Sequence, residues 1–423
     1  MRGKQTHTFL CSLFLFGVLF LSLQAQDSVT TLAGQTLVSG AVNGAGTNAL
    51  FSDPAAIVVA TNGDYFVADS RNHAIRKVTT NGVVTTFAGK LGISGSANAT
   101  GTNATFNTPS GLAIDGSGNL LVSDTGNNVI RKISSAGAVT TLAGVAGSSG
   151  FLDGANGSAL FNSPLGIAVS SSGVVFVTDS GNHCLRKISD STVTTFAGRP
   201  QVWGSADGMG TNALFNAPCG LAFDAGGNLF VSDANNDTIR KTTPNGLVTT
   251  FAGAAGQDGA TDGDLRSTRF RSPASLAFDK KGNLFVADSF NQTVREISSN
   301  GIVSTVCGEA GIAGTVDGTN GVARFFNPYG IVVAADGSLV VADAYNQLVR
   351  VVIVPFKLAL QISGGTKISW DTVIGKSYQV QFKTDLAAAW TNLGSPLTAA
   401  GLSLSATDSG AGGAHFYRVL RLN

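Results

Sequence analysis

The sequence predicts an all-β protein. Short apolar runs rich in β-branched and aromatic residues alternate with Gly, Asn, Asp and Pro turn signals along most of the chain. The segment 215–253 shows the pattern, and we expect its strands at 220–224, 228–233, 238–242 and 247–252. Gly-Gly, Asn-Asn-Asp and Pro-Asn-Gly separate these runs and are hairpin signals. The segment therefore predicts a four-stranded antiparallel meander.

The meander recurs at a fixed period. A proline in an F-x-x-P motif precedes each first strand, and it returns every 54 or 55 residues. The prolines are Pro54, Pro109, Pro164, Pro218, Pro273 and Pro328. A fixed period of this length is typical of solenoids, propellers and arrays. Four strands per repeat favour a β-propeller, which has about 4–8 blades. The six repeats predict a six-bladed β-propeller.

The two ends of the repeat region complement each other. The last repeat stops at Val354-Pro355 and lacks the V-T-T-F-A-G run that forms the fourth strand elsewhere. A matching run, V-T-T-L-A-G, stands alone at 29–34. We expect this N-terminal strand to complete the last blade, closing the propeller and removing an open sheet edge.

An acid and an arginine are kept in every repeat. The Asp ends the second strand. The Arg lies on the third strand, two residues after the residue that pairs with this Asp, so both side chains are on the same face and the Arg can reach the Asp. The residues are Asp69, Asp124, Asp179, Asp233, Asp288 and Asp343 with Arg76, Arg131, Arg186, Arg240, Arg295 and Arg350. An ion pair repeated in all six units indicates a structural role, because repeat folds preserve their own packing residues.

The repeated string A-D-S-x-N-H-x-I-R-K, with P-x-G-[IL]-A before it, resembles the NHL repeat of six-bladed propellers. The resemblance covers about residues 28–353. It implies no zinc-dependent lyase activity, since NHL-like amidating lyases use three histidines and the repeats hold only His73 and His183. Gluconolactonase-type propellers hold a divalent cation through Glu, Asn and Asp. The glutamates here, Glu296 and Glu309, lie outside the first strands that line a channel.

Residues 1–25 resemble a secretory signal, with Arg2 and Lys4 before an apolar run and Ala25 at a plausible cleavage position. We expect a secreted, periplasmic or cell-surface protein without a membrane span after cleavage. The balanced charge, 27 basic against 26 acidic residues, argues against a nucleic-acid partner. Cys184, Cys219 and Cys307 remain after cleavage, an odd set that predicts buried thiols.

Residues 26–354 are thus assigned to the propeller and 357–423 to a second domain. In the second domain, apolar residues alternate at 358–362, 368–370 and 378–382, and aromatic residues occur near its end. This pattern predicts a small β-sandwich. It is similar to the fibronectin-type-III-like modules that end many secreted bacterial proteins.

The connections between blades are long and share one face with the loops between second and third strands, so binding is expected on that face. Bulky residues occur there in blades one, five and six, which become neighbours when the ring closes. The candidate ligand-binding residues are Arg71, Phe290, Tyr329, Tyr345 and Trp203. The alternative is that these rings pack beneath the loops or plug the channel.

The sequence favours non-catalytic binding of a protein, peptide or glycan on the long-loop face. The alternative is a metal-dependent, lactonase-like hydrolase or lyase with its site in the propeller channel. A third interpretation is a surface spacer. We expect no catalytic residues and no cofactor. Asp-Gly pairs in the connections leave calcium as an unsupported option, because their spacing does not match an EF-hand and suits plain turns.

Overall fold

The computed structural model describes residues 28–319, 321–354, 358–362, 366–372, 376–384, 388–409 and 416–422. The expected signal at 1–25 lies outside the described residues. Two compact units are present, one spanning Ser28–Val352 and the other containing residues 353–423. Each unit is all-β apart from short 3₁₀ turns.

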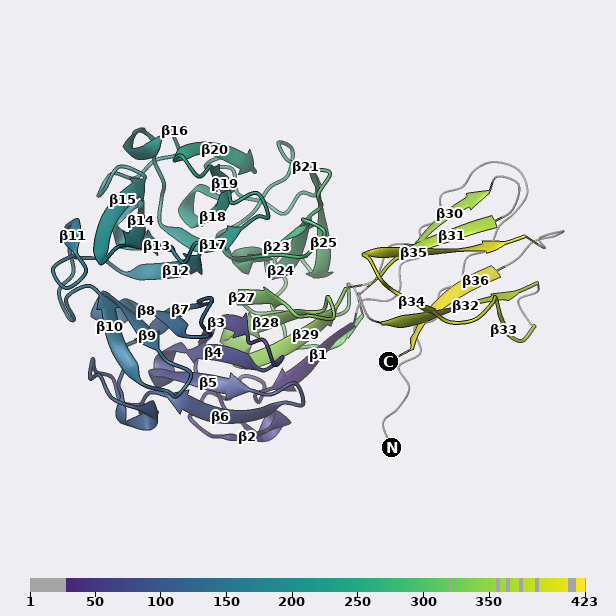
Figure 1. The fold of residues 1–423 in the computed structure, drawn as a ribbon, viewed down its shortest axis with the longest axis horizontal. Helices are drawn as coiled ribbons and strands as arrows, with labels where there is room; N and C mark the ends of the chain where they lie inside the picture. Colours follow the sequence, from purple (N-terminus) through teal and green to yellow (C-terminus); the bar gives the residue numbers. More distant parts are fainter. Residues whose placement is uncertain are drawn as a thin grey trace. The chain divides into compact units, whose positions relative to one another are not determined.

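Six antiparallel sheets form a ring in the larger unit (Figure 1). Each sheet runs from a first strand at the centre to a fourth strand near the outside, and neighbouring first strands contact one another around the whole ring. The fold is a six-bladed β-propeller, as the period predicted. The first strands are β3 (Pro54–Val59), β7 (Pro109–Ile114), β12 (Pro164–Val169), β17 (Pro218–Phe223), β22 (Pro273–Phe278) and β27 (Pro328–Val333).

The second and third strands are joined by a short 3₁₀ turn in every blade. The second strands are β4 (Tyr65–Asp69), β8 (Leu120–Asp124), β13 (Val175–Asp179), β18 (Leu229–Asp233), β23 (Leu284–Asp288) and β28 (Leu339–Asp343). The turns are η2 (Ser70–Asn72), η4 (Thr125–Asn127), η5 (Ser180–Asn182), η7 (Ala234–Asn236), η8 (Ser289–Asn291) and η9 (Ala344–Asn346). The third strands are β5 (Ala74–Val78), β9 (Val129–Ile133), β14 (Cys184–Ser189), β19 (Thr238–Thr242), β24 (Thr293–Ile297) and β29 (Leu348–Ile353).

The fourth strands include one from the far end of the chain. Five blades use β6 (Val83–Ala88), β10 (Val139–Ala143), β15 (Thr192–Ala197), β20 (Leu247–Ala252) and β25 (Ile302–Gly308). In the sixth blade β1 (Ser28–Ala33) lies between β29 and the outer strand β26 (Gly318–Thr319). The backbone N–H of Thr31 donates to Asp317 at 2.8 Å, which ties β1 to the connection before that blade.

The connections between blades were expected to be loops, and the structure adds a short outer strand to most of them. Besides β26, the outer strands are β2 (Gly44–Ala45), β11 (Gly154–Ala155), β16 (Gly208–Met209) and β21 (Gly263–Asp264). The second blade has a single bridge, Thr100 to Ala138, at this place. The 3₁₀ turns η1 (Gly46–Asn48), η3 (Gly101–Asn103) and η6 (Gly210–Asn212) follow in three connections. Each connection therefore returns along the next blade's outer edge before it enters the centre.

The core lies between neighbouring blades. Phe176 and Leu185 of blade three, for example, pack against Phe215 and Val231 of blade four. Close approach of the first strands is set by backbone atoms, because a Cβ added at Gly166 would lie 2.0 Å from the carbonyl oxygen of Cys219. Burial of apolar side chains on both faces of each sheet holds the ring together.

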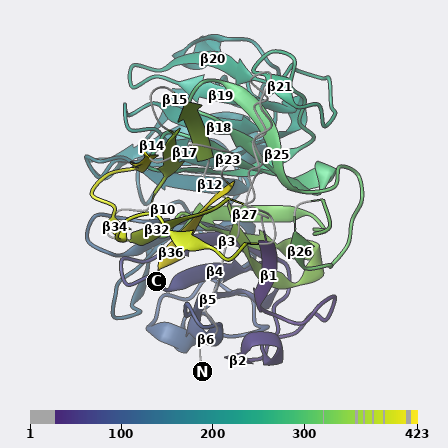
Figure 2. The same cartoon turned by 90° about the vertical axis from the view of Figure 1, so that its right-hand side faces the viewer.

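The second unit contains two small sheets. One sheet has the order β30 (Leu358–Ile362), β31 (Thr366–Asp371), β35 (Ser403–Asp408). In the other, β32 (Ser377–Lys383) pairs with β33 (Thr391–Asn392), β34 (Leu397–Thr398) and β36 (Phe416–Leu422), and Figure 2 shows β32 beside β36. The two sheets share one core that includes Trp370, Tyr378 and Val419. The likeness to a fibronectin type III module stays a prediction.

Candidate binding face

A buried ion pair in each blade holds the long connections in place. The Nη1 atom of Arg76 lies 2.6 Å from Asp69, and both side chains are fully buried. The same guanidinium donates to the carbonyl oxygens of Leu50 and Val42 at 3.0 and 2.8 Å, and it lies over the ring of Phe51. Because Leu50 and Val42 belong to the connection, the blade core fixes the path of the loop above it.

The other five blades repeat this arrangement, with Arg–Asp distances between 2.7 and 3.1 Å. Burial raises the pKa of Asp69 to about 6, while Arg76 and hydrogen bonds from Asn72 and Ser52 oppose the rise. The carboxyl group is therefore ionised at neutral pH. These twelve residues form the framework of the long-loop face.

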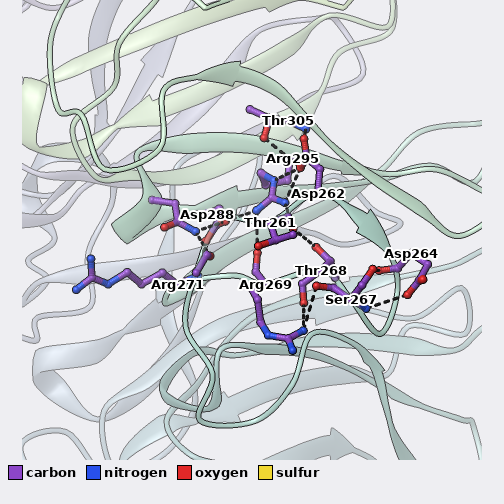
Figure 3. Close-up of polar contacts among 12 residues, drawn as sticks. Thr261, Asp262, Asp264, Ser267, Thr268, Arg269, Arg271, Asp288, Arg295 and Thr305 are labelled. Atoms are coloured by element: carbon purple, nitrogen blue, oxygen red, sulfur yellow. Dashed lines mark hydrogen bonds and ion pairs between the residues drawn. The ribbon is translucent and has the colours of Figure 1, made fainter.

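The Asp-Gly pairs of the connections have a role that the sequence did not reveal. In blade five Arg295 contacts both Asp288 at 2.8 Å and Asp262 at 2.6 Å (Figure 3). Asp262 also accepts hydrogen bonds from the backbone N–H and hydroxyl of Thr305. Asp153, Asp207 and Asp317 make the corresponding ion pairs in their blades. These carboxylates already neutralise a buried guanidinium, so the plain-turn interpretation was incomplete.

One further hydrogen bond joins each blade to the next. The residue that follows each 3₁₀ turn between the second and third strands has a positive φ, and its side chain accepts the backbone N–H of the residue before the next blade's proline. His73 and His183 act as acceptors through Nδ1, each at 3.1 Å from its donor. The other acceptors are Asn128, Asp237, Gln292 and Gln347. Both histidines are thus parts of joints between blades, and burial lowers the pKa of each.

Three of the candidate residues lie in neighbouring turns. Phe290 is 52% exposed in η8 and Tyr345 is 43% exposed in η9, where its ring packs edge-on against Phe326. Arg71 is exposed in η2, and its Nε lies 3.3 Å from Asp53. The corresponding positions of blades two to four hold Gly126, Gly181 and Asn235. Among these six turn positions, the bulky residues are therefore those of blades five, six and one.

The structure adds aliphatic residues to this half of the face. Leu37, Ile93 and Ile312 are each about half exposed. The backbone N–H of Leu37 donates to Asn346 in the turn that carries Tyr345, and that of Gly311 donates to Asn291 beside Phe290. We call Phe290, Ile312, Tyr345, Leu37 and Arg71 the apolar arc. The sequence offered no signal for Leu37 and Ile312, because their exposure depends on how the connections fold back over the turns.

Tyr329 lies apart from the exposed rings. It is the second residue of β27, it is half-buried, and its hydroxyl is 3.1 Å from the Sγ of Cys219 in blade four. The phenol thus reaches across the end of the channel, which is the plugging role weighed as the alternative. Burial raises the pKa of Cys219 to about 11, so its thiol is protonated at neutral pH and is a poor nucleophile.

Trp203 is exposed but stands away from the apolar arc. Its connection precedes blade four and is hydrogen-bonded to the turn of blade three, through the N–H of Gln201 and the carbonyl of Asn182. Blade three is on the opposite side of the ring from blade six. The structure therefore does not bring Trp203 together with Phe290 and Tyr345.

The channel offers little for metal or acid–base chemistry. A cavity of about 240 Å³ there is lined by Ala, Ile, Leu, Val, Gly and Ser residues with Cys219 and Tyr329, and no lining residue is a carboxylate. Glu296 is buried on β24, and Glu309 forms an ion pair with Arg324 at the surface. Within the described residues no three His, Cys, Asp or Glu side chains are grouped so that they could hold a metal ion.

Comparison with known proteins finds NHL repeats at residues 51–78, 106–133 and 161–188. NHL repeat-containing protein 2 of Gallus gallus is 29% identical over 64% of this chain and 41% of its own length. The chain spans less than half the length of the curated relatives it matches.

Two solved structures share the fold at low sequence identity. An auxiliary nutrient binding protein from Bacteroides thetaiotaomicron has a TM-score of 0.60 at 14% identity, covering 78% of this chain and 76% of that one. A gluconolactonase from Xanthomonas campestris has a TM-score of 0.50 at 14% identity, covering 82% of this chain and all of that one. At such identity the likeness shows the fold alone. No helix in the described residues is long and apolar enough to span a membrane.

Proposed function

Because this chain is a six-bladed propeller built from NHL repeats, we propose that it is an exported binding protein that holds a protein, peptide or glycan on its long-loop face. The observation that carries the proposal is the apolar arc. Large apolar side chains that stay exposed together on turns of a rigid scaffold are typical of recognition surfaces. The proposal that the protein is exported rests on the signal-like segment 1–25.

The scaffold supports binding by pre-organisation. Phe290 and Tyr345 project from short 3₁₀ turns whose following Asn is buried and bonded to the Asp of the ion pair. Each ring has few rotatable bonds, so little conformational entropy is lost when a ligand covers it. A planar ring of a sugar or an aromatic or proline residue of a peptide would stack on such side chains.

The alternative is a hydrolase or lyase with a divalent metal in the channel, favoured only by the fold shared with the gluconolactonase. The apolar channel lining and the positions of Glu296 and Glu309 argue against it. Metal analysis of the purified protein tests it directly. Stoichiometric metal that is lost when Tyr329 and Cys219 are replaced would favour the enzyme.

The binding proposal is tested on oligosaccharide and peptide arrays, with the full chain and two double variants. Phe290→Ala with Tyr345→Ala should weaken binding by about 30-fold or more, since a true anchor contributes about 2 kcal/mol. The control, Lys280→Ala with Lys281→Ala, changes a short turn after β22 on the opposite face and should bind as the parent does. Equal losses in both variants would contradict the proposed face.

A further inference from the structure

A second cavity lies between blades three and four on the short-loop face, away from the apolar arc. It has a volume of about 190 Å³. Its walls include Phe176 and Phe196 of blade three and Phe223 of blade four. Their rings meet edge to face, with centroids 4.9 and 5.5 Å apart. A cavity of about 150 Å³ with apolar walls is large enough to hold benzene, so this one accepts a ring of that size.

The cavity lies where blade four departs from the repeat. Thr242 ends the third strand of that blade, at the position where the other five blades have Val78, Ile133, Ile188, Ile297 and Val352. In other blades this Val or Ile belongs to an apolar core between neighbouring blades. Threonine lacks one methylene of the isoleucine in blades two, three and five, and it has a hydroxyl where the valine of blades one and six has a methyl group. Its hydroxyl is buried and has no hydrogen-bond partner among the described residues.

The charge at this cavity also departs from the repeat. Lys187 lines it, directly across the strand pair from Phe176. In blades one and two the corresponding lysines are neutralised by acids of the first turn, Lys77 by Asp64 and Lys132 by Asp115. Blade three has Val174 and Ser170 at those two acid positions. No ion pair of Lys187 is found in the described part of the chain, and no cavity-lining residue is acidic.

Three features of this cavity are typical of a binding site. Its walls are mostly apolar, the ammonium group of Lys187 has no acid beside it, and the buried hydroxyl of Thr242 has no partner among the described residues. The aromatic walls suit the body of a small apolar ligand, and Lys187 supplies a positive charge at the rim. A charge-assisted hydrogen bond to a carboxylate is stronger than one between neutral groups. We propose that this cavity binds a small aromatic or aliphatic carboxylate of about the size of benzoate.

Benzoate is the probe for the test, titrated calorimetrically into the full-length chain. We expect a dissociation constant of about 1 mM or tighter, as the efficiency of small ligands allows. Lys187→Met keeps the apolar stem but removes the charge, and it should weaken binding about tenfold or more. Thr242→Ile restores the side chain of blades two, three and five and should abolish binding by filling the space.

The matched control is Lys132→Met, which removes the equivalent lysine from a blade where an acid already neutralises it. It should bind benzoate as the parent does, and benzamide should bind the parent at least tenfold more weakly than benzoate. No binding at about 10 mM benzoate, equal affinity for benzamide, or equal losses in Lys187→Met and Lys132→Met would overturn the proposal. Unchanged affinity in Thr242→Ile would place the ligand elsewhere and would overturn it as well.

Discussion

Replacing Arg131 with methionine should destabilise the propeller far more than the same change at the adjacent Lys132. Arg131 is fully buried, and its guanidinium contacts Asp124 at 2.8 Å, Asn98 at 2.8 Å and the carbonyl oxygens of Thr105 and Ala97. Methionine replaces the aliphatic part of the side chain but leaves the Asp124 carboxylate buried beside only the donors of Asn107 and Asn127.

Breaking a buried ion pair by removing one partner costs about 3–5 kcal/mol. For a unit of this size we expect a melting temperature lower by about 6–10 °C, at about 2 °C per kcal/mol. Lys132 is partly exposed, and its ion pair with Asp115 at 3.3 Å should contribute about 0–1 kcal/mol. Scanning calorimetry of both variants decides the matter. Equal melting temperatures would refute a structural role for the buried pair.

Three further predictions concern the joints and the ends of the propeller. Deleting residues 26–35 removes β1 and leaves β29 as an open edge, so the variant should aggregate; an unchanged melting temperature with monomeric elution in size-exclusion chromatography would contradict this. A fragment of residues 26–356 should fold and stay soluble, because few contacts cross a domain boundary; insolubility of the fragment alone would show that the boundary is misplaced. Replacing His73 and His183 with asparagine, which makes the same bond at position 128, should reduce the loss of stability on acidification. Burial lowers the pKa of both histidines, so their contribution is complete above the unfolded value of about 6.5 and is lost as pH falls through the lower folded value. Urea midpoints at about pH 7.5 and 5 measure the difference, and equal pH dependence in parent and variant would show that the histidine bonds do not matter.

The repeat made the blades predictable. In blade four, β19 and β20 have the expected bounds, because Pro-Asn-Gly and Asn-Asn-Asp mark turns by local chemistry alone. The two-residue outer strands were missed, since segments such as Gly44–Ala45 are too short to show an alternation of apolar and polar residues and pair only because the connection returns along the blade edge.

The candidate site was only partly predictable. Turn residues such as Phe290 and Tyr345 could be assigned to one face from strand direction alone. Tyr329 could not be placed correctly, because a side chain at the start of a first strand can point outward or toward Cys219 across the channel. The role of His73 was hidden for a similar reason, as its partner is a backbone N–H in the next blade.

The hydrogen bonds between blades affect where the chain of this propeller could begin. Gln347 accepts from the N–H of Asp53 at the junction of blades six and one, and Asn128 accepts in the same way from Ser163 at the junction of blades two and three. The two ends of the propeller sequence meet inside blade six instead, where β29 pairs with β1. A circularly permuted chain, with a turn leading from β29 into β1 and new ends opened in the connection 145–160, would keep the same acceptor and donor at that junction. The closed ring therefore does not determine which blade comes first in the sequence.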